Sequence, residues 1–240
     1  MATSKIVGED VKLLGHWASI FVVRARIALN LKGVSYEFLE EEIGSKAELV
    51  KSELLLESNP VYKKIPVLIH GGKPICESLI IVQYIDEAWD RRGPSILPYD
   101  PHDRALARFW AVYVDEFITQ WIVSFFTMLR ANTEETKTEA TEKTITGLRN
   151  LEEAFTKCSK GKQFFGGDAI GYLDIALGCN LGWIKAAPEL SSVELLDATK
   201  TPKLAAWAEQ FWAQDAVKGV LPDASKFVEF ANMIRARKTA

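Results

Sequence analysis

Ser19 occupies a position that suits either a helix cap or a binding group. It stands where a short apolar run, LLGHWA, meets a long amphipathic segment, IFVVRARIALNLKG. A serine at a helix start commonly accepts a hydrogen bond from a backbone amide of the first turn. The same amides attract anions, and a hydroxyl beside them can donate a hydrogen bond to one. The sequence leaves both interpretations open.

Ser19 lacks the neighbours that a serine nucleophile needs. The chain has three histidines, His16, His70 and His102, and no Gly-x-Ser-x-Gly motif. His16 lies close to Ser19 in the sequence, but that spacing does not direct its ring toward the hydroxyl. A Ser-His-Asp hydrolase is therefore disfavoured.

A second candidate binding element is the segment KKIPVLIHGGKPICES, which begins at Lys63. Proline has no amide hydrogen, so Pro66 fits the start of a strand better than its middle. A trans Ile65–Pro66 bond is the common case, whereas a cis bond would turn the backbone of Ile65 toward an extended, peptide-like ligand. Lys63 and Lys64 are either solvated surface charges or an anchor for a carboxylate.

Glu77 and Ser78 end this segment and open the helical pattern SLIIVQYIDEAW. They could simply cap the helix and interact with its dipole. Alternatively, the helix start could hold a carboxylate while Glu77 binds an ammonium group, as an amino-acid head would require. Taken together, Ser19, Ile65, Glu77 and Ser78 describe a site for a γ-glutamyl tripeptide thiol.

The first ninety or so residues alternate between strand and helix patterns. We expect the order β-α-β-α-β-β-α, with a small mixed sheet and helices on both of its faces. The predicted strands and helices are 11–15, 19–32, 34–42 and 47–56, then two strands within 63–78 on either side of a Gly71-Gly72 turn, and a helix over 78–89. A Pro- and Gly-containing stretch, DRRGPSILPYDPHD, predicts a domain boundary. We place the first domain at 1–92, a linker at 93–101 and an all-helical domain at 102–240. Within the last, the segment GYLDIALGCNLGWIKAA, residues 171–187, is predicted to form one helix.

Composition narrows the functional classes. The chain has 240 residues, a formal net charge of −3 and 48% hydrophobic residues, as is usual for a globular protein. No basic segment interleaved with aromatics is present, so nucleic acid is not an expected partner. The apolar stretch WIVSFFTML is too short to span a bilayer, and we expect no membrane association. Three widely spaced cysteines form no metal-binding pattern, so we expect free thiols, no metal and a cytosolic location.

The motifs resemble those of the plant tau-class glutathione S-transferases over essentially the whole chain. The similar segments include VKLLGHWASIFVVRARIALNLKGVSYEF, NPVYKKIPVLIHGGKPICESLIIVQYIDEAW, FFGGDAIGYLDIAL and KFVEFANMIRAR. The resemblance implies an N-terminal thioredoxin-like domain, an all-α C-terminal domain and a homodimer. It also implies conjugation of glutathione to hydrophobic, often xenobiotic electrophiles, with glutathione peroxidase activity common in the family.

The resemblance also assigns roles to individual residues. Ser19 matches the serine that stabilises the glutathione thiolate. The other implied glutathione-binding residues are Lys51, Lys64, Ile65, Pro66, Glu77 and Ser78. Lys46 competes with Lys51, because the chain has about five extra residues before NP. Asp174, in GYLD, matches a structural capping residue of the family.

The implied electrophile pocket lies along the long first helix of the second domain and the C-terminal helix. Its matching positions are Phe21, Thr119, Val123, Phe126, Trp183, Phe230, Ile234 and Arg237. For Phe126 and Trp183, packing in an ordinary helix core is an equally good interpretation.

One residue departs from the family pattern, which usually has proline after the catalytic serine. Here Ile20 follows Ser19. Isoleucine is not forbidden at this position, so we expect the helix to form with a less rigid first turn. This departure keeps a second function in consideration: a non-catalytic carrier of hydrophobic ligands with the same fold.

Overall fold

The computed structural model describes residues 10–42, 51–130, 134–191 and 194–239. The chain divides into two compact units, Met1–Pro94 and Ser95–Ala240. Within the described residues, no helix combines the length and apolar character needed to cross a membrane.

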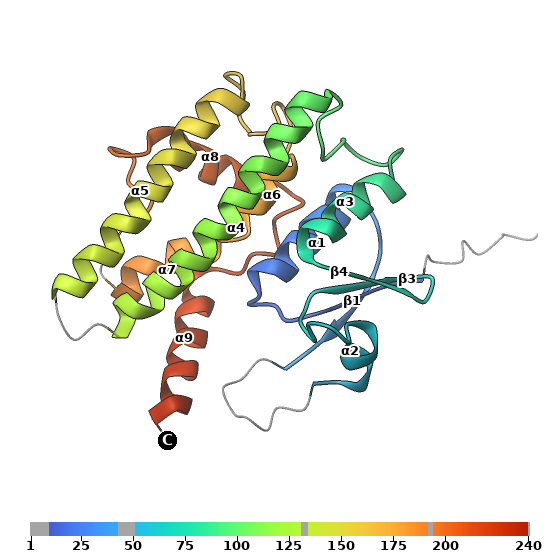
Figure 1. The fold of residues 1–240 in the computed structure, drawn as a ribbon, viewed down its shortest axis with the longest axis horizontal. Helices are drawn as coiled ribbons and strands as arrows, with labels where there is room; N and C mark the ends of the chain where they lie inside the picture. Colours follow the sequence, from blue (N-terminus) through green and yellow to red (C-terminus); the bar gives the residue numbers. More distant parts are fainter. Residues whose placement is uncertain (1–9, 43–50, 131–133, 192–193, 240) are drawn as a thin grey trace, which may run out of the picture. The chain divides into compact units, whose positions relative to one another are not determined.

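The first unit is built on a four-stranded sheet (Figure 1). The strand order is β2-β1-β3-β4; β1 and β2 are parallel, and the other two pairs are antiparallel. The expected order of strands and helices is confirmed. The elements are β1 (Val11–Gly15), α1 (Ile20–Leu31), β2 (Glu37–Glu40), α2 (Glu53–Ser58), β3 (Val67–His70), β4 (Lys73–Cys76) and α3 (Ser78–Ala88).

Helices cover both faces of this sheet, as the sequence predicts. On one face, Leu55 of α2 packs against Leu14, Val67 and Ile69. Helices α1 and α3 pack together on the other face. Gly15 permits a close approach there, because a Cβ at this position would lie 2.5 Å from a methyl carbon of Val22.

The prediction for α2 was wrong at its start. The sequence pattern predicts a helix over 47–56, but the structure begins α2 at Glu53, and residues 43–50 lie outside the described part. The hydroxyl of Ser52 accepts a hydrogen bond from the backbone amide of Leu55 at 3.0 Å and so caps the helix. The same hydroxyl donates to the carboxylate of Glu41.

The second unit is helical throughout its described elements. The long helices α4 and α5 pack against each other, α6 contacts α4 and α8, and α7 packs on α9. The elements are α4 (Pro101–Arg130), α5 (Glu134–Cys158), α6 (Tyr172–Gly178), α7 (Leu181–Ser191), α8 (Pro202–Trp212) and α9 (Ala224–Thr239).

The single helix predicted over 171–187 is in fact two helices. The chain breaks at Cys179 and Asn180, between α6 and α7. The backbone amide and the side-chain amide of Asn180 both donate to the carbonyl oxygen of Leu177, at 3.1 and 2.9 Å. This local pattern replaces the regular helical bond, because an asparagine side chain competes for backbone groups.

Asp174 organises the start of α6 from a fully buried position. Its carboxylate accepts hydrogen bonds from the backbone amides of Phe165 (2.9 Å), Gly166 (2.8 Å) and Gly171 (2.9 Å). The indole nitrogen of Trp207 donates a fourth bond at 2.7 Å. Burial raises the pKa of Asp174 to about 6, although these four donors favour the charged form.

This buried carboxyl predicts a pH-dependent stability. A pKa of about 6 in the folded protein lies above the ordinary value of 3.8, so burial favours the protonated form. The associated stability is present below pH 4 and is lost as the pH rises through about 6. Relative to an Asp174→Asn variant, which cannot titrate, the wild type should lose about 2 kcal/mol of unfolding free energy between pH 4 and pH 7.

Urea unfolding at a series of pH values measures this difference. Asp168→Asn is the matched control, because Asp168 is largely exposed and its substitution should leave the pH profile unchanged. Parallel profiles for the wild type and Asp174→Asn would contradict the assignment.

Candidate functional site

Strand register brings three candidate segments to one edge of the sheet. Leu14 of β1 lies opposite Val67 of β3, and Val67 lies opposite Cys76 of β4. Antiparallel pairing therefore places the end of β1, the start of β3 and the end of β4 side by side. Ser19 follows β1 in the sequence, the Ile65–Pro66 bond precedes β3, and Glu77 and Ser78 follow β4. All three candidate segments therefore leave the sheet at the same edge.

Ser19 is the N-cap residue of α1, but its hydroxyl does not cap the helix. Its φ and ψ are −79° and 115°, and no side-chain cap hydrogen bond is present. Its carbonyl oxygen accepts the amides of Val22 and Val23, both at 3.0 Å. Within the described residues the hydroxyl makes no hydrogen bond. Of the two interpretations of Ser19, the free hydroxyl favours the binding group over the cap.

His16 is occupied elsewhere and does not activate Ser19. Its Nδ1 accepts the backbone amide of Ala18 at 3.1 Å, and its Nε2 lies 3.9 Å from a carboxylate oxygen of Glu40. The side chain is largely buried in this arrangement. The site therefore has no serine–histidine pair within the described residues.

The Ile65–Pro66 bond is cis, which settles the alternative left open by the sequence. Within the described residues, neither the amide nor the carbonyl of Ile65 has a hydrogen-bond partner. Both groups are available to pair with an extended backbone. This is the arrangement that binds a peptide-like ligand by main-chain hydrogen bonds.

Asn59 holds the loop before this bond, and sequence analysis missed its role. Its side-chain nitrogen donates to the carbonyl oxygen of Lys64 at 3.0 Å, and its side-chain oxygen accepts the amide of Tyr62 at 3.1 Å. Asn59 is buried. The turn-forming pair Asn-Pro was the only signal available in the sequence.

Lys51 contacts the same loop. Its ammonium group donates a hydrogen bond to the carbonyl oxygen of Lys63. Lys63 itself has a positive φ of 53°, which marks a tight turn in the chain. Lys46, the competing candidate, lies outside the described residues.

Glu77 and Ser78 differ in environment. Glu77 is exposed, has a φ of 71°, and makes no side-chain cap hydrogen bond, so its carboxylate is available to a cation. Ser78 is buried, and its hydroxyl accepts a hydrogen bond from Nη1 of Arg24 at 3.2 Å. Since the oxygen accepts from Arg24, the hydroxyl hydrogen can be donated to a carboxylate.

Arg24 is a second residue that sequence analysis missed. It lies fully buried in α1, and its guanidinium carbon lies 5.3 Å from the ring centroid of Phe21. An arginine on the apolar face of a helix gives no pattern that distinguishes a packed side chain from one that supports a site.

The predicted electrophile residues are only partly described. Trp183 in α7 packs against two aromatic rings of α9, with centroids 5.0 Å from Phe227 and 6.3 Å from Phe230. Phe230 is buried, so its ring takes part in the packing of these helices. The side chains of Thr119, Val123, Phe126, Ile234 and Arg237 lie outside the described part.

Comparison with known proteins identifies the family. Residues 9–87 match the family described as Glutathione S-transferase, N-terminal domain, and residues 138–210 match Glutathione S-transferase, C-terminal domain. Glutathione S-transferase U18 of Arabidopsis thaliana is 54% identical over 232 residues, which cover 97% of this chain and 99% of the relative. The chain belongs to the tau class of the glutathione S-transferases.

Solved structures of this class have the same fold. A tau-class glutathione S-transferase from mango, Mangifera indica, has a TM-score of 0.86 and 56% identity, covering 94% of this chain and 98% of that one. Rice GST1 in complex with glutathione has a TM-score of 0.83 and 34% identity, covering 96% and 98%. The fold predicted from the resemblance, a thioredoxin-like domain followed by a helical domain, is confirmed.

The chain is accordingly a glutathione transferase, an enzyme that conjugates glutathione to electrophiles. The comparisons do not support the alternative of a non-catalytic carrier.

The contacts of Asn59 predict a selective loss of substrate affinity. Asn59→Ala removes two hydrogen bonds that hold the backbone next to Ile65, so glutathione should meet a less ordered loop. We expect the KM for glutathione to rise about tenfold and kcat to change little. Steady-state kinetics with varied glutathione gives both constants. Asn150→Ala, which removes an exposed hydrogen bond to Tyr113, is the control and should leave KM unchanged. Equal effects of the two substitutions would refute this role.

Proposed function

We propose that Ser19 stabilises the thiolate of glutathione and that the neighbouring segments bind the rest of the tripeptide. The observation that carries the proposal is the hydroxyl of Ser19, which stands at the start of α1 without a hydrogen-bond partner among the described residues. A sulfur anion placed there would accept this hydroxyl and lie at the positive end of the helix dipole.

The hydrogen bond from Ser19 and the helix dipole together can supply the free energy needed to ionise the glutathione thiol at neutral pH. A thiol with a pKa of about 8.5 is only a few per cent ionised at pH 7. Lowering that pKa by about two units takes roughly 2.7 kcal/mol of preferential thiolate stabilisation. A hydrogen bond to a charged group contributes about 1.5–3 kcal/mol, and a helix N-terminus about 0.3–1 kcal/mol. No general base is needed.

The remaining groups suit the other parts of glutathione. The backbone of Ile65, before cis Pro66, would pair with the central cysteine residue of the tripeptide. Glu77 would bind the ammonium group of the γ-glutamyl end, and the hydroxyl of Ser78 would donate to its carboxylate. Lys51 and Lys64 would attract the carboxylate of the glycine end.

We also propose that hydrophobic electrophiles bind at Phe21, Thr119, Val123, Phe126, Trp183, Phe230, Ile234 and Arg237. Holding the electrophile beside a formed thiolate would supply most of the remaining rate enhancement. The three cysteines are all free, which supports a reducing compartment, and we place the enzyme in the cytosol.

Substitution of Ser19 tests the thiolate assignment. Ser19→Ala should lower kcat by about tenfold to a hundredfold, because one hydrogen bond to a charged group is lost. The dissociation constant of glutathione, measured by calorimetry, should change little. Ser19→Thr keeps a hydroxyl and should recover part of the activity together with the lowered thiol pKa, read from the ultraviolet absorbance of the thiolate. Full activity in Ser19→Ala would exclude the role.

We propose that two copies form a homodimer through exposed apolar side chains. In α4, Phe109 and Val112 are 61% and 57% exposed, and in the first unit Val61, Tyr62 and Ile80 are 78%, 59% and 55% exposed. Apolar surface of this kind commonly marks a protein interface.

A charge on the exposed apolar face of α4 should separate the copies. Phe109→Glu places a carboxylate in the interface, and we expect dimer dissociation to become at least about a hundredfold more favourable. Size-exclusion chromatography with light scattering over a range of concentrations measures it. Met233→Glu, at an exposed apolar side chain of α9, is the control and should remain dimeric. An unchanged dimer in Phe109→Glu would show that α4 is not the interface.

A further inference from the structure

The turn that joins β1 to α1 and ends at Ser19 is held by side chains as well as by backbone. The amide of Trp17 donates to Oε1 of Glu40 at 3.2 Å, and the amide of Ala18 donates to Nδ1 of His16 at 3.1 Å. The amide of Ser19 donates to the carbonyl oxygen of His16 at 3.0 Å. Two of these three acceptors are side-chain atoms, so the shape of the turn depends on His16 and Glu40.

His16 is itself held in a defined orientation. Its side chain is almost completely buried, and its ring centroid lies 5.6 Å from that of Trp17. Because Nδ1 accepts a hydrogen bond, the ring hydrogen of the neutral imidazole lies on Nε2. Nε2 is 3.9 Å from Oε1 of Glu40. A carboxylate on that side favours the tautomer in which Nδ1 is free to accept the amide of Ala18.

The sheet brings Glu40 to this turn. Glu40 is the last residue of β2 and lies opposite Gly15, the last residue of β1. The amide of Glu41 donates to the carbonyl oxygen of Gly15 at 2.7 Å and so extends the parallel pairing by one bond. The register of β1 and β2 thus places one carboxylate oxygen beside both the amide of Trp17 and the ring of His16.

Ser19 depends on its backbone for its direction. Its hydroxyl makes no hydrogen bond among the described residues, so no contact of the side chain fixes where it points. On the helix side, the carbonyl oxygen of Ser19 accepts the amides of Val22 and Val23. Ile20 does not fix its own φ, whereas a proline at that position would hold it at about −65°. The turn before Ser19 therefore supplies the other restraint on this residue.

We propose that His16 and Glu40 are positioning residues of the transferase, which hold the turn so that the hydroxyl of Ser19 points at the thiolate of glutathione. The inference rests on the role of Ser19 proposed above and extends it to two residues that act only through the backbone of the turn. A catalytic group that is slightly misplaced loses much of its effect on the rate, because the reacting geometry must be met closely.

Replacement of His16 tests the positioning role. His16→Leu keeps an apolar side chain in the buried position and removes the acceptor for the amide of Ala18. We expect kcat to fall about fivefold, as for the loss of one neutral hydrogen bond, and the dissociation constant of glutathione to change little. The pKa of the bound thiol, read from the ultraviolet absorbance of the thiolate, should rise.

His16→Asn is the conservative variant. An asparagine side chain can accept the amide two residues further along the chain, so it can replace Nδ1 in this turn. We expect it to recover at least about half of the wild-type kcat, together with the low pKa of the bound thiol. A role of His16 in packing alone would give no such recovery.

A double-mutant cycle separates this proposal from that of Ser19. In a Ser19→Ala background, His16→Leu should lower kcat by less than about twofold, because the hydroxyl that it aims is absent. Full activity in Ser19→Ala would remove the role of Ser19 itself. A weakened Ser19→Ala enzyme in which His16→Leu still lowers kcat fivefold would overturn only the positioning role of His16.

Glu40 provides a second pair of variants. Its side chain is 50% exposed, so Glu40→Ala should fold. This variant removes the acceptor for the amide of Trp17, and we expect kcat to fall about two- to threefold and the pKa of the bound thiol to rise. Glu40→Gln keeps a side-chain oxygen for that amide and should retain the wild-type values.

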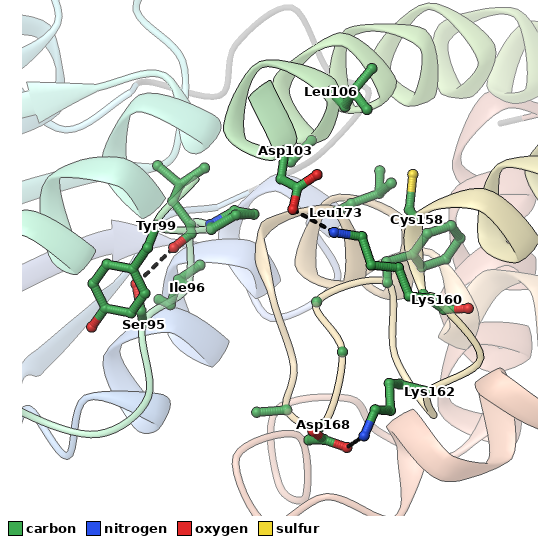
Figure 2. A pocket seen from close by; sticks show the side chains of 18 of the residues that line it. Ser95, Ile96, Tyr99, Asp103, Leu106, Cys158, Lys160, Lys162, Asp168 and Leu173 are labelled. Atoms are coloured by element: carbon green, nitrogen blue, oxygen red, sulfur yellow. Dashed lines mark hydrogen bonds and ion pairs between the residues drawn. The ribbon is translucent and has the colours of Figure 1, made fainter. Parts of the chain in front are cut away.

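Three controls remove side chains away from the turn. Glu37→Ala, on the same strand as Glu40, removes an ion pair with Lys12 at 3.8 Å. His70→Leu removes a half-buried imidazole from β3. Lys160→Met removes an ion pair with Asp103 at 2.7 Å in the second unit, which Figure 2 shows. All three should keep the wild-type kcat and thiol pKa.

The proposal fails if His16→Leu and Glu40→Ala both keep the wild-type kcat and thiol pKa, or if His16→Asn is no more active than His16→Leu. It also fails if Glu37→Ala raises the thiol pKa as much as Glu40→Ala does. Should His16→Leu not fold, Glu40→Ala and Glu40→Gln decide the question, and the cycle with Ser19→Ala is then made with Glu40→Ala.

Discussion

The register between β1, β3 and β4 is the constraint on which the proposed glutathione site depends. Leu14, Val67 and Cys76 lie in one row across the sheet, and the three segments that follow or precede this row bear the candidate binding groups. A slip of one residue in either pair would turn Leu14 or Val67 away from Leu55 and α2. The packing that selects the register thus also aligns the site.

Two parts of the proposed site, the hydroxyl of Ser19 and the backbone of Ile65, have no hydrogen-bond partner within the described residues. Ser19 and Asp174 illustrate the difference, since both stand at the start of a helix. The carboxylate of Asp174 receives four hydrogen bonds and is fully buried, so it can serve only the stability of the second unit. The hydroxyl of Ser19 receives none and is partly exposed, so its hydrogen-bonding capacity is available to a ligand. Both residues stand at a helix start. They differ in whether the fold supplies hydrogen-bond partners for the side chain, and this difference decides which of them is available to a ligand.

Periodicity and turn residues were sufficient to predict the order of elements in the first unit, because each strand and helix there has a distinct apolar pattern. They failed where a side chain acts on the backbone. The side chain of Asn180 divides one predicted helix into α6 and α7. The side chain of Ser52 caps α2, which begins at Glu53, later in the sequence than predicted. The supporting residues of the site were missed for the same reason: Asn59 and Arg24 act through contacts that depend on the folded positions of Lys64 and Ser78. Ile20 does not prevent α1 from starting directly after Ser19, as expected.

Buried charged side chains join α1 and α3, the two helices that begin at the proposed site. Near their starts, α1 and α3 are joined by the hydrogen bond from Arg24 to Ser78. Near their ends they are joined again, because the ammonium group of Lys32 lies 2.7 Å from the carboxylate of Asp86 and donates to the carbonyl oxygen of Pro94 at 2.9 Å. Removing one partner of such a buried pair leaves an uncompensated charge, which costs several kcal/mol, about 3–5 in measured cases. Two fixed points on each helix leave little freedom for one to slide or rotate past the other. The distance between Ser19 and Ser78 is therefore set by the same buried charges that stabilise the unit, and glutathione would meet both ends of its site already in position.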